Sequence, residues 1–251
     1  MTRFLLIRHA QKDVPSDQLP GRRDGVHLTV EGRAAAKQLA AALQPFAIQR
    51  LFTSPLLRAR ETAEPIAAAN GLEIVPVENF NEVDLGEWTG LTFAELESFP
   101  EWKTYNSVRS LAVIPGGESM LEVQARFVSQ LLRFAREFPE EVIAVVSHAD
   151  PIRSALLFFL GRPLDDWPSI DIAEASVSIV DANAGEANVE DASAGEMNLG
   201  DARAGEINLG DASATRFRIV AINLTADGLT ERRPALSEAA RNGAPASGRL
   251  P

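Results

Sequence analysis

The sequence contains no cysteine and only three histidines, His9, His27 and His148, in 251 residues. The lack of cysteine excludes disulfides, cysteine-ligated zinc, iron–sulfur clusters and thiol catalysis. No apolar run approaches the roughly 18 residues of a membrane span. The first residues have a four-residue apolar core between two arginines, too short for a secretory signal. We therefore expect a cytoplasmic protein that does not bind membranes and in which histidine chemistry uses one of three side chains.

Composition and charge narrow the class further. Hydrophobic residues make up 45% and charged residues 24% of the chain, as in ordinary globular proteins that bury a core. The formal net charge is −11, which argues against nucleic-acid or anionic-membrane binding through bulk charge.

An acidic repeat occupies residues 181–214, with eight acidic residues and one base. Its near-identical units, such as DASAGEMNLG and DARAGEINLG, resemble the pentapeptide-repeat pattern. Seven five-residue units are few for a solenoid, so a solvated, flexible loop is an equally good interpretation. The flanks 174–180 and 215–223 have strand patterns and predict a hairpin with the repeat inserted at its tip. A protein partner for the repeat is an open possibility.

The rest of the chain alternates between strand and helix patterns. We expect strands at 4–7, 49–53, 72–77 and 142–147, and helices at 29–43, from Ser54-Pro55 onward, at 118–138, and from Pro151 to 160. This alternation predicts a three-layer α/β/α sandwich with a mostly parallel sheet. We expect one domain over 1–231, interrupted by the insertion 181–214, and a disordered tail over 232–251.

Candidate functional residues follow two of the predicted strands. Arg8 and His9 end the first strand, and His148 follows 142–147. Ligands of such sheets bind at the carboxyl ends of the strands. Arg58 lies one turn into a helix that starts at the same edge, and Glu82 lies in a glycine-rich loop. This set of two arginines, two histidines and one carboxylate suits a site that binds an anion and transfers one proton during the reaction.

Five motifs together resemble the histidine phosphatase superfamily, which includes the phosphoglycerate mutases. They are Arg8-His9-Ala10, SPLLRARETA (54–63), NEVDLGEWTG (81–90), PGGES (115–119) and VSHA (146–149). The nearest branch is that of small phosphomutases and phosphatases. Ala10 replaces the family's glycine, and QKDVPSDQ (11–18) lacks the tryptophan- and asparagine-bearing loop of the mutase branch.

The resemblance implies a phosphoglycerate mutase-like fold and a phosphoric monoester hydrolase. His9 would attack phosphorus and form a phosphohistidine, and Glu82 would move the proton of the leaving group. Arg8, Arg58 and His148 would bind the phosphoryl oxygens. The expected substrate is a small phosphorylated metabolite, and neither a metal nor another cofactor is expected.

Two other functions stay open at this point. A mutase of the phosphoglycerate type would return the phosphoryl group to the substrate instead of releasing it. A phospho-ligand binding or scaffold protein would use the repeat at 181–214 and would not need turnover.

Some residue assignments also stay open. Asp84 competes with Glu82 as the acid, and His27 fits a loop or packing role. Trp88 and Trp102 fit either the substrate pocket or the core. Substrate specificity is expected from the polar segments 11–25 and 91–117.

Overall fold

A computed structural model describes residues 1–184, 206–207 and 215–231. Most of the acidic repeat and the whole predicted tail lie outside these residues, so the expectations for their order stay predictions. The described residues contain one seven-stranded sheet in the order β3-β2-β4-β1-β5-β7-β6.

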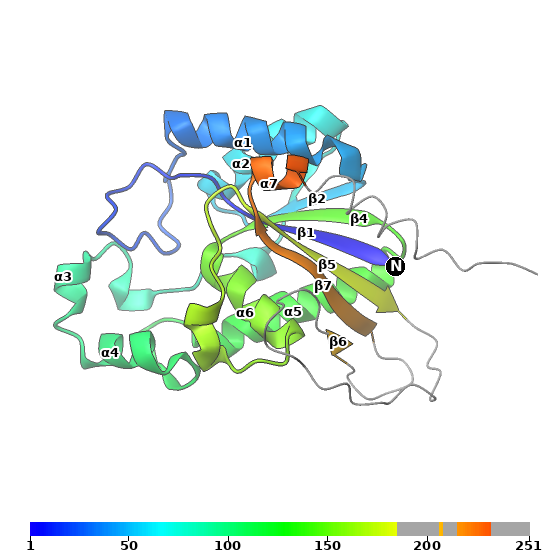
Figure 1. Cartoon of the computed structure of the whole chain (residues 1–251). Coiled ribbons are helices and arrows are strands. Elements are labelled where there is room, and N and C mark those ends of the chain that lie inside the picture. Colours follow the sequence, from blue (N-terminus) through cyan, green and yellow to red (C-terminus); the bar gives the residue numbers. More distant parts are fainter. Residues whose placement is uncertain (185–205, 208–214, 232–251) are drawn as a thin grey trace, which may run out of the picture.

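The sheet has a parallel half and an antiparallel half (Figure 1). The parallel strands are β1 (Thr2–Arg8), β2 (Arg50–Thr53), β3 (Ile74–Pro76) and β4 (Val142–Ser147). The antiparallel pairings add β5 (Val177–Ala184), β6 (Glu206–Ile207) and β7 (Thr215–Leu224). The predicted fold class is confirmed, and the sheet is more mixed than the sequence pattern indicated.

Helices cover both faces of the sheet and make it the middle of three layers (Figure 1). One face carries α1 (Val30–Leu43), α2 (Leu57–Asn70) and α7 (Ala226–Glu231), and the other carries α5 (Met120–Glu137) and α6 (Ala149–Phe159). The short helices α3 (Phe93–Leu96) and α4 (Pro100–Ser107) lie beyond the carboxyl ends of β1 and β4. Short 3-10 turns span Gln44–Phe46, Glu78–Phe80, Gly86–Trp88, Arg109–Leu111 and Leu164–Ser169. Within the described ranges, no helix has the length and apolar character to cross a bilayer.

Local sequence signals explain most helix boundaries. The Thr29 hydroxyl accepts a hydrogen bond from the Gly32 amide and caps α1. Ser119 and Glu122 form a capping box at the start of α5, whose apolar stripe is buried as predicted. That stripe consists of Val123, Phe127, Leu131, Phe134 and, partly buried, Phe138.

Two helices begin elsewhere than predicted. α2 starts at Leu57 rather than at Ser54-Pro55, because the Ser54 amide donates to the Val146 carbonyl and extends the sheet. α6 starts at Ala149 rather than at Pro151. Pro151 lies in its first turn, where the missing N–H group costs nothing.

The predicted hairpin is present as β5 paired with β7, and β5 continues to Ala184. The first four residues of the predicted insertion, 181–184, thus belong to the sheet. Asp181 explains why. Its buried carboxylate accepts two hydrogen bonds from Arg3 of β1, at 2.7 and 2.9 Å, and one from Arg218 of β7 at 3.3 Å. One carboxylate therefore connects three strands.

We expect Asp181→Ala to destabilise the protein strongly, by about 3–5 kcal/mol, because it leaves the buried Arg3 guanidinium without its charged partner. Arg218→Ala is the matched control. The Arg218 side chain is 42% exposed, so its loss should cost at most about 1 kcal/mol. Urea unfolding of both variants measures the difference, and equal losses would contradict this account.

Candidate active site

The site lies where β1 and β4 end side by side. These strands pair in parallel, with Arg8 opposite Ser147, and a histidine follows each strand. The rings of His9 and His148 therefore meet edge to face, with centroids 5.1 Å apart. The loop after β1, together with α3 and α4, lies on this side of the sheet (Figure 1).

His9 is held as a neutral imidazole with one nitrogen free. Its Nδ1 lies 2.7 Å from the Ala10 carbonyl oxygen, which can only accept, so Nδ1 carries the proton and Nε2 keeps its lone pair. Burial, and then the positive charges of Arg58 and Arg8, hold the pKa of His9 well below its ordinary value. Ala10 is not among the residues with positive φ, so the change from glycine is tolerated.

Arg8 and Arg58 place unused hydrogen-bond donors in the same cavity. Arg8 donates to the Ile172 carbonyl, and Arg58 donates to the Gly21 carbonyl at 2.8 Å. The Nε atom of Arg8 and the Nε and Nη1 atoms of Arg58 are buried and have no partner among the residues that the structure describes. Buried donors without an acceptor are costly, so this arrangement favours a bound anion.

Glu82 reaches this group of cations from the loop after β3. Its Oε2 lies 3.9 Å from Arg58 Nη2 and 3.6 Å from His148 Nδ1. Burial, and then the negative charge of Asp150, raise the pKa of Glu82, although Arg58 and Arg8 oppose the shift. A carboxyl group with a raised pKa keeps its proton to higher pH, which suits a proton donor.

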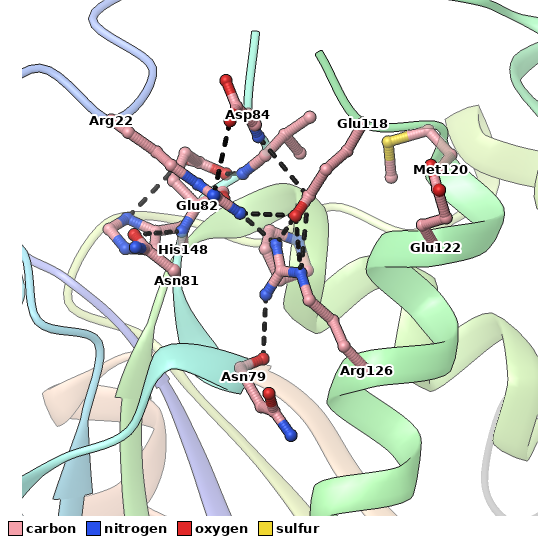
Figure 2. Close-up of polar contacts among 12 residues, drawn as sticks. Arg22, Asn79, Asn81, Glu82, Asp84, Glu118, Met120, Glu122, Arg126 and His148 are labelled. Carbon is pink, nitrogen blue, oxygen red and sulfur yellow. Dashed lines mark hydrogen bonds and ion pairs between the residues drawn. The ribbon is translucent and has the colours of Figure 1, made fainter.

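A second group of side chains fixes the backbone at Glu82. Arg22 and Arg126 both donate to the Glu82 carbonyl oxygen, at 2.8 and 3.0 Å. Figure 2 shows Glu118, just before α5, between these two guanidinium groups. The Glu118 carboxylate accepts from Arg22 at 2.5 Å and from Arg126 at 3.0 Å. Two charge-assisted contacts therefore hold the acid loop against α5.

The structure shows where the other candidates of the sequence analysis lie. Asp84 turns away from the cavity, accepts from the Gly86 amide and lies 3.5 Å from Arg22. His27 is half exposed and pairs with Glu61 at 2.6 Å, outside the cavity. Trp88 is fully buried in the core. Of the two acidic candidates, Glu82 is thus the one that lines the same cavity as His9.

The cavity lining combines cationic and aromatic side chains. The cavity is about 360 Å³, and its lining includes Lys12, Trp102, Tyr105 and Arg109. The Arg109 guanidinium packs on the Tyr105 ring and donates to Asp150 at 3.2 Å. Lys12 is 3.9 Å from its nearest carboxylate, Glu174, and burial lowers its pKa. Of Lys12 and Arg109, Lys12 therefore has the longer contact with a carboxylate.

The sequence analysis brought His9, Arg8, Arg58, Glu82 and His148 to one edge, and the structure brings them together in one site. The sequence analysis missed the supporting residues Glu118 and Arg126, and it expected the segment 11–25, which contains Arg22, to contribute to substrate specificity. The PGGES motif was the available signal for Glu118, but its partners come from distant segments. In the described part of the chain, no group of three or more histidines and carboxylates is arranged to hold a metal ion.

Comparison with known proteins decides the family. Residues 4–194 match the family model of the histidine phosphatase superfamily, branch 1. The chain belongs to this superfamily. It is 30% identical over 183 residues to phosphoserine phosphatase 1 of Hydrogenobacter thermophilus, covering 72% of this chain and 86% of the relative.

Two further comparisons show the range of the superfamily. The 2,3-bisphosphoglycerate-dependent phosphoglycerate mutase of Thermoplasma acidophilum is 27% identical, covering 72% of this chain and 88% of the mutase. Mycobacterial glucosyl-3-phosphoglycerate phosphatase in complex with VO3 superposes with a TM-score of 0.66 at 26% identity. That match covers 72% of this chain and 92% of the phosphatase.

We expect Glu118→Gln to lower phosphate release about 10²-fold, because a weaker link between Arg22 and Arg126 lets the Glu82 loop shift. Glu122→Gln is the matched control. Glu122 lies in the first turn of α5, four residues after Glu118, and among the described residues its side chain bonds to Ser119 at the helix cap (Figure 2). It should change stability and leave turnover close to that of the parent. Steady-state kinetics measures the turnover of both variants. Equal turnover would show that the contacts of Glu118 with Arg22 and Arg126 have no functional role.

Proposed function

We propose that this protein is a metal-independent phosphatase that hydrolyses small phosphomonoesters through a phosphohistidine on His9. The observation that carries the proposal is the set of buried N–H groups of Arg8 and Arg58 that have no acceptor among the described residues and lie beside a neutral imidazole. Planar guanidinium groups match the geometry of phosphate oxygens and neutralise their charge. The family match and the phosphatases among the relatives support the same reaction class.

The first chemical step follows from the positions of His9 and Glu82. His9 Nε2 attacks phosphorus, the bond from phosphorus to the ester oxygen breaks, and Glu82 gives its proton to that oxygen. The hydrogen bond from Nδ1 to the Ala10 carbonyl stabilises the positive charge that develops on the imidazole. Arg8, Arg58 and His148 bind the phosphoryl oxygens.

The second step reverses the role of Glu82. A water attacks the phosphohistidine, gives its proton to the Glu82 carboxylate and breaks the bond between phosphorus and Nε2. Inorganic phosphate leaves, and His9 and the protonated Glu82 are restored for the next cycle.

The substrate within this proposal is a small phosphorylated metabolite with a second anionic group. Lys12 and Arg109 line the same cavity as Arg8 and Arg58 and add positive charge for a second anionic group. The names of the relatives, phosphoserine phosphatase and glucosyl-3-phosphoglycerate phosphatase, fit such compounds. A cytoplasmic location, and the absence of nucleic-acid and membrane partners, stay predictions from the sequence.

A phosphomutase is the second candidate, and the similarity to a phosphoglycerate mutase favours it. A mutase must return the phosphoryl group before water reaches it. Isomerisation of 2- and 3-phosphoglycerate that exceeds phosphate release would identify the mutase. A partner of the 181–214 repeat concerns residues mostly outside the described ranges and stays an untested prediction.

We expect the parent protein to release phosphate in the presence of EDTA and His9→Ala to release none. The screen uses phosphoserine, phosphoglycerates, sugar phosphates and nucleotides. Acid-labile, base-stable ³²P should remain on the parent after denaturing quench and be missing from His9→Ala, since a nitrogen–phosphorus bond has this stability. The control is His27→Gln, whose histidine lies outside the cavity.

Two outcomes would overturn the mechanism. Loss of turnover in EDTA would show a metal-dependent reaction. Full turnover of His9→Ala would show that His9 is not the nucleophile.

We expect Glu82→Gln to reduce kcat for alkyl phosphates about 10²–10⁴-fold, because the amide cannot protonate the leaving oxygen. The loss in phosphorylation rate should be much smaller for p-nitrophenyl phosphate, whose phenolate leaves without a proton. Competitive inhibition by inorganic phosphate should persist, since the arginines are intact. Rapid-quench kinetics measures phosphorylation of both substrates. An equal loss for both would contradict a role in leaving-group protonation.

A further inference from the structure

Ser54 contacts the ring of His148 on the side away from Glu82. The Ser54 hydroxyl oxygen lies 2.8 Å from His148 Nε2, and both residues are fully buried. The other ring nitrogen, Nδ1, is 3.6 Å from Glu82 Oε2 and has no hydrogen-bond partner within the described residues. The two nitrogens of one ring therefore have different surroundings, and Figure 2 shows the side that faces Glu82.

The neighbours of Ser54 decide where its single hydroxyl proton goes. The Leu56 amide donates to the hydroxyl oxygen at 3.3 Å and occupies one lone pair. Two acceptors compete for the proton, namely His148 Nε2 at 2.8 Å and Asn81 Oδ1 at 3.5 Å. Asn81 Oδ1 already accepts the Glu82 amide at 2.9 Å. His148 Nε2 makes the shorter contact and has no other donor within the described ranges, so the hydroxyl donates to Nε2.

A neutral imidazole has one N–H group, and His148 is held neutral by its surroundings. Burial, and then the charge of Arg58, place the pKa of His148 well below its ordinary value. If Nε2 accepts from Ser54, the ring proton must reside on Nδ1.

We propose that Ser54 is a positioning residue that fixes His148 as the Nδ1–H tautomer, so that this neutral ring donates a hydrogen bond toward the reacting group. Its part in phosphoryl transfer rests on the function proposed above. The assignment of the tautomer does not depend on that function.

The opposite tautomer would oppose anion binding. With the proton on Nε2, His148 would turn a lone pair toward the oxygens of the phosphoryl group and toward the carboxylate of Glu82. A donor aimed at developing negative charge stabilises a transition state, and a lone pair at the same place repels it. The Ser54 hydroxyl therefore determines whether His148 stabilises or destabilises the transition state of phosphoryl transfer.

Nitrogen NMR reads this tautomer directly. Protein labelled with ¹⁵N-histidine contains only three rings, and His27→Gln and His9→Ala assign their signals. Long-range ¹H–¹⁵N correlation spectra distinguish protonated from unprotonated ring nitrogens. We expect Nδ1 of His148 to carry the proton in the parent protein. We expect Ser54→Ala to move the proton wholly or partly to Nε2.

The kinetic counterpart is an expected loss of about 10²-fold in kcat/KM for p-nitrophenyl phosphate in Ser54→Ala, the size of losing one transition-state donor. Thr53→Val is the matched control. It removes a buried hydroxyl from the adjacent residue, where the Thr53 hydroxyl bonds to the Ser54 carbonyl and not to His148. This control should keep both the tautomer and the turnover of the parent.

Three results would overturn the proposal. They are a proton on Nε2 of His148 in the parent, an unchanged tautomer in Ser54→Ala, or the same tautomer change in Thr53→Val. A protein that released no phosphate would refute the proposed function and leave the ring spectra readable, so the two failures are distinguishable.

Discussion

The parallel pairing of β1 with β4 is the constraint on which the site depends. It aligns Arg8 with Ser147, so that the residues following each strand, His9 and His148, meet at 5.1 Å between ring centroids. Both strands are buried on both faces between helices, which leaves their register little freedom. The sheet at the centre of the core thereby also fixes the spacing of His9 and His148.

Burial then sets the charge state of the groups brought together. Buried donor atoms of Arg8 and Arg58 have no partner among the described residues. Burial, and then the positive charge of these arginines, lowers the pKa of His9 and of His148 and favours their neutral forms. The same burial, with Asp150, raises the pKa of Glu82. Among the described residues, these arginines therefore have more donors than acceptors at the site. A phosphoryl dianion would supply the missing acceptors and the missing negative charge.

A shell of polar residues holds these reactive groups in place. Adjacent residues of one loop serve two of them, because the Gly21 carbonyl accepts from Arg58 and Arg22 donates to the Glu82 carbonyl. Glu118 joins Arg22 to Arg126, and Ser54 contacts His148 on the side of the ring away from Glu82. These polar residues come from segments that are distant in the chain. The geometry of the site therefore depends on how the helices pack against the sheet.

The sequence by itself determined the alternation of elements and the five residues of the site, because apolar runs and short motifs are local signals. It predicted the hairpin of β5 and β7, but it did not show that β5 pairs antiparallel with β1, that β5 extends to Ala184, or that α2 starts at Leu57. It also gave no role to Glu118 or Ser54. Only the tertiary structure decided these, because each depends on partners from other segments: Asp181 on Arg3, Glu118 on Arg22, and Ser54 on a histidine 94 positions away.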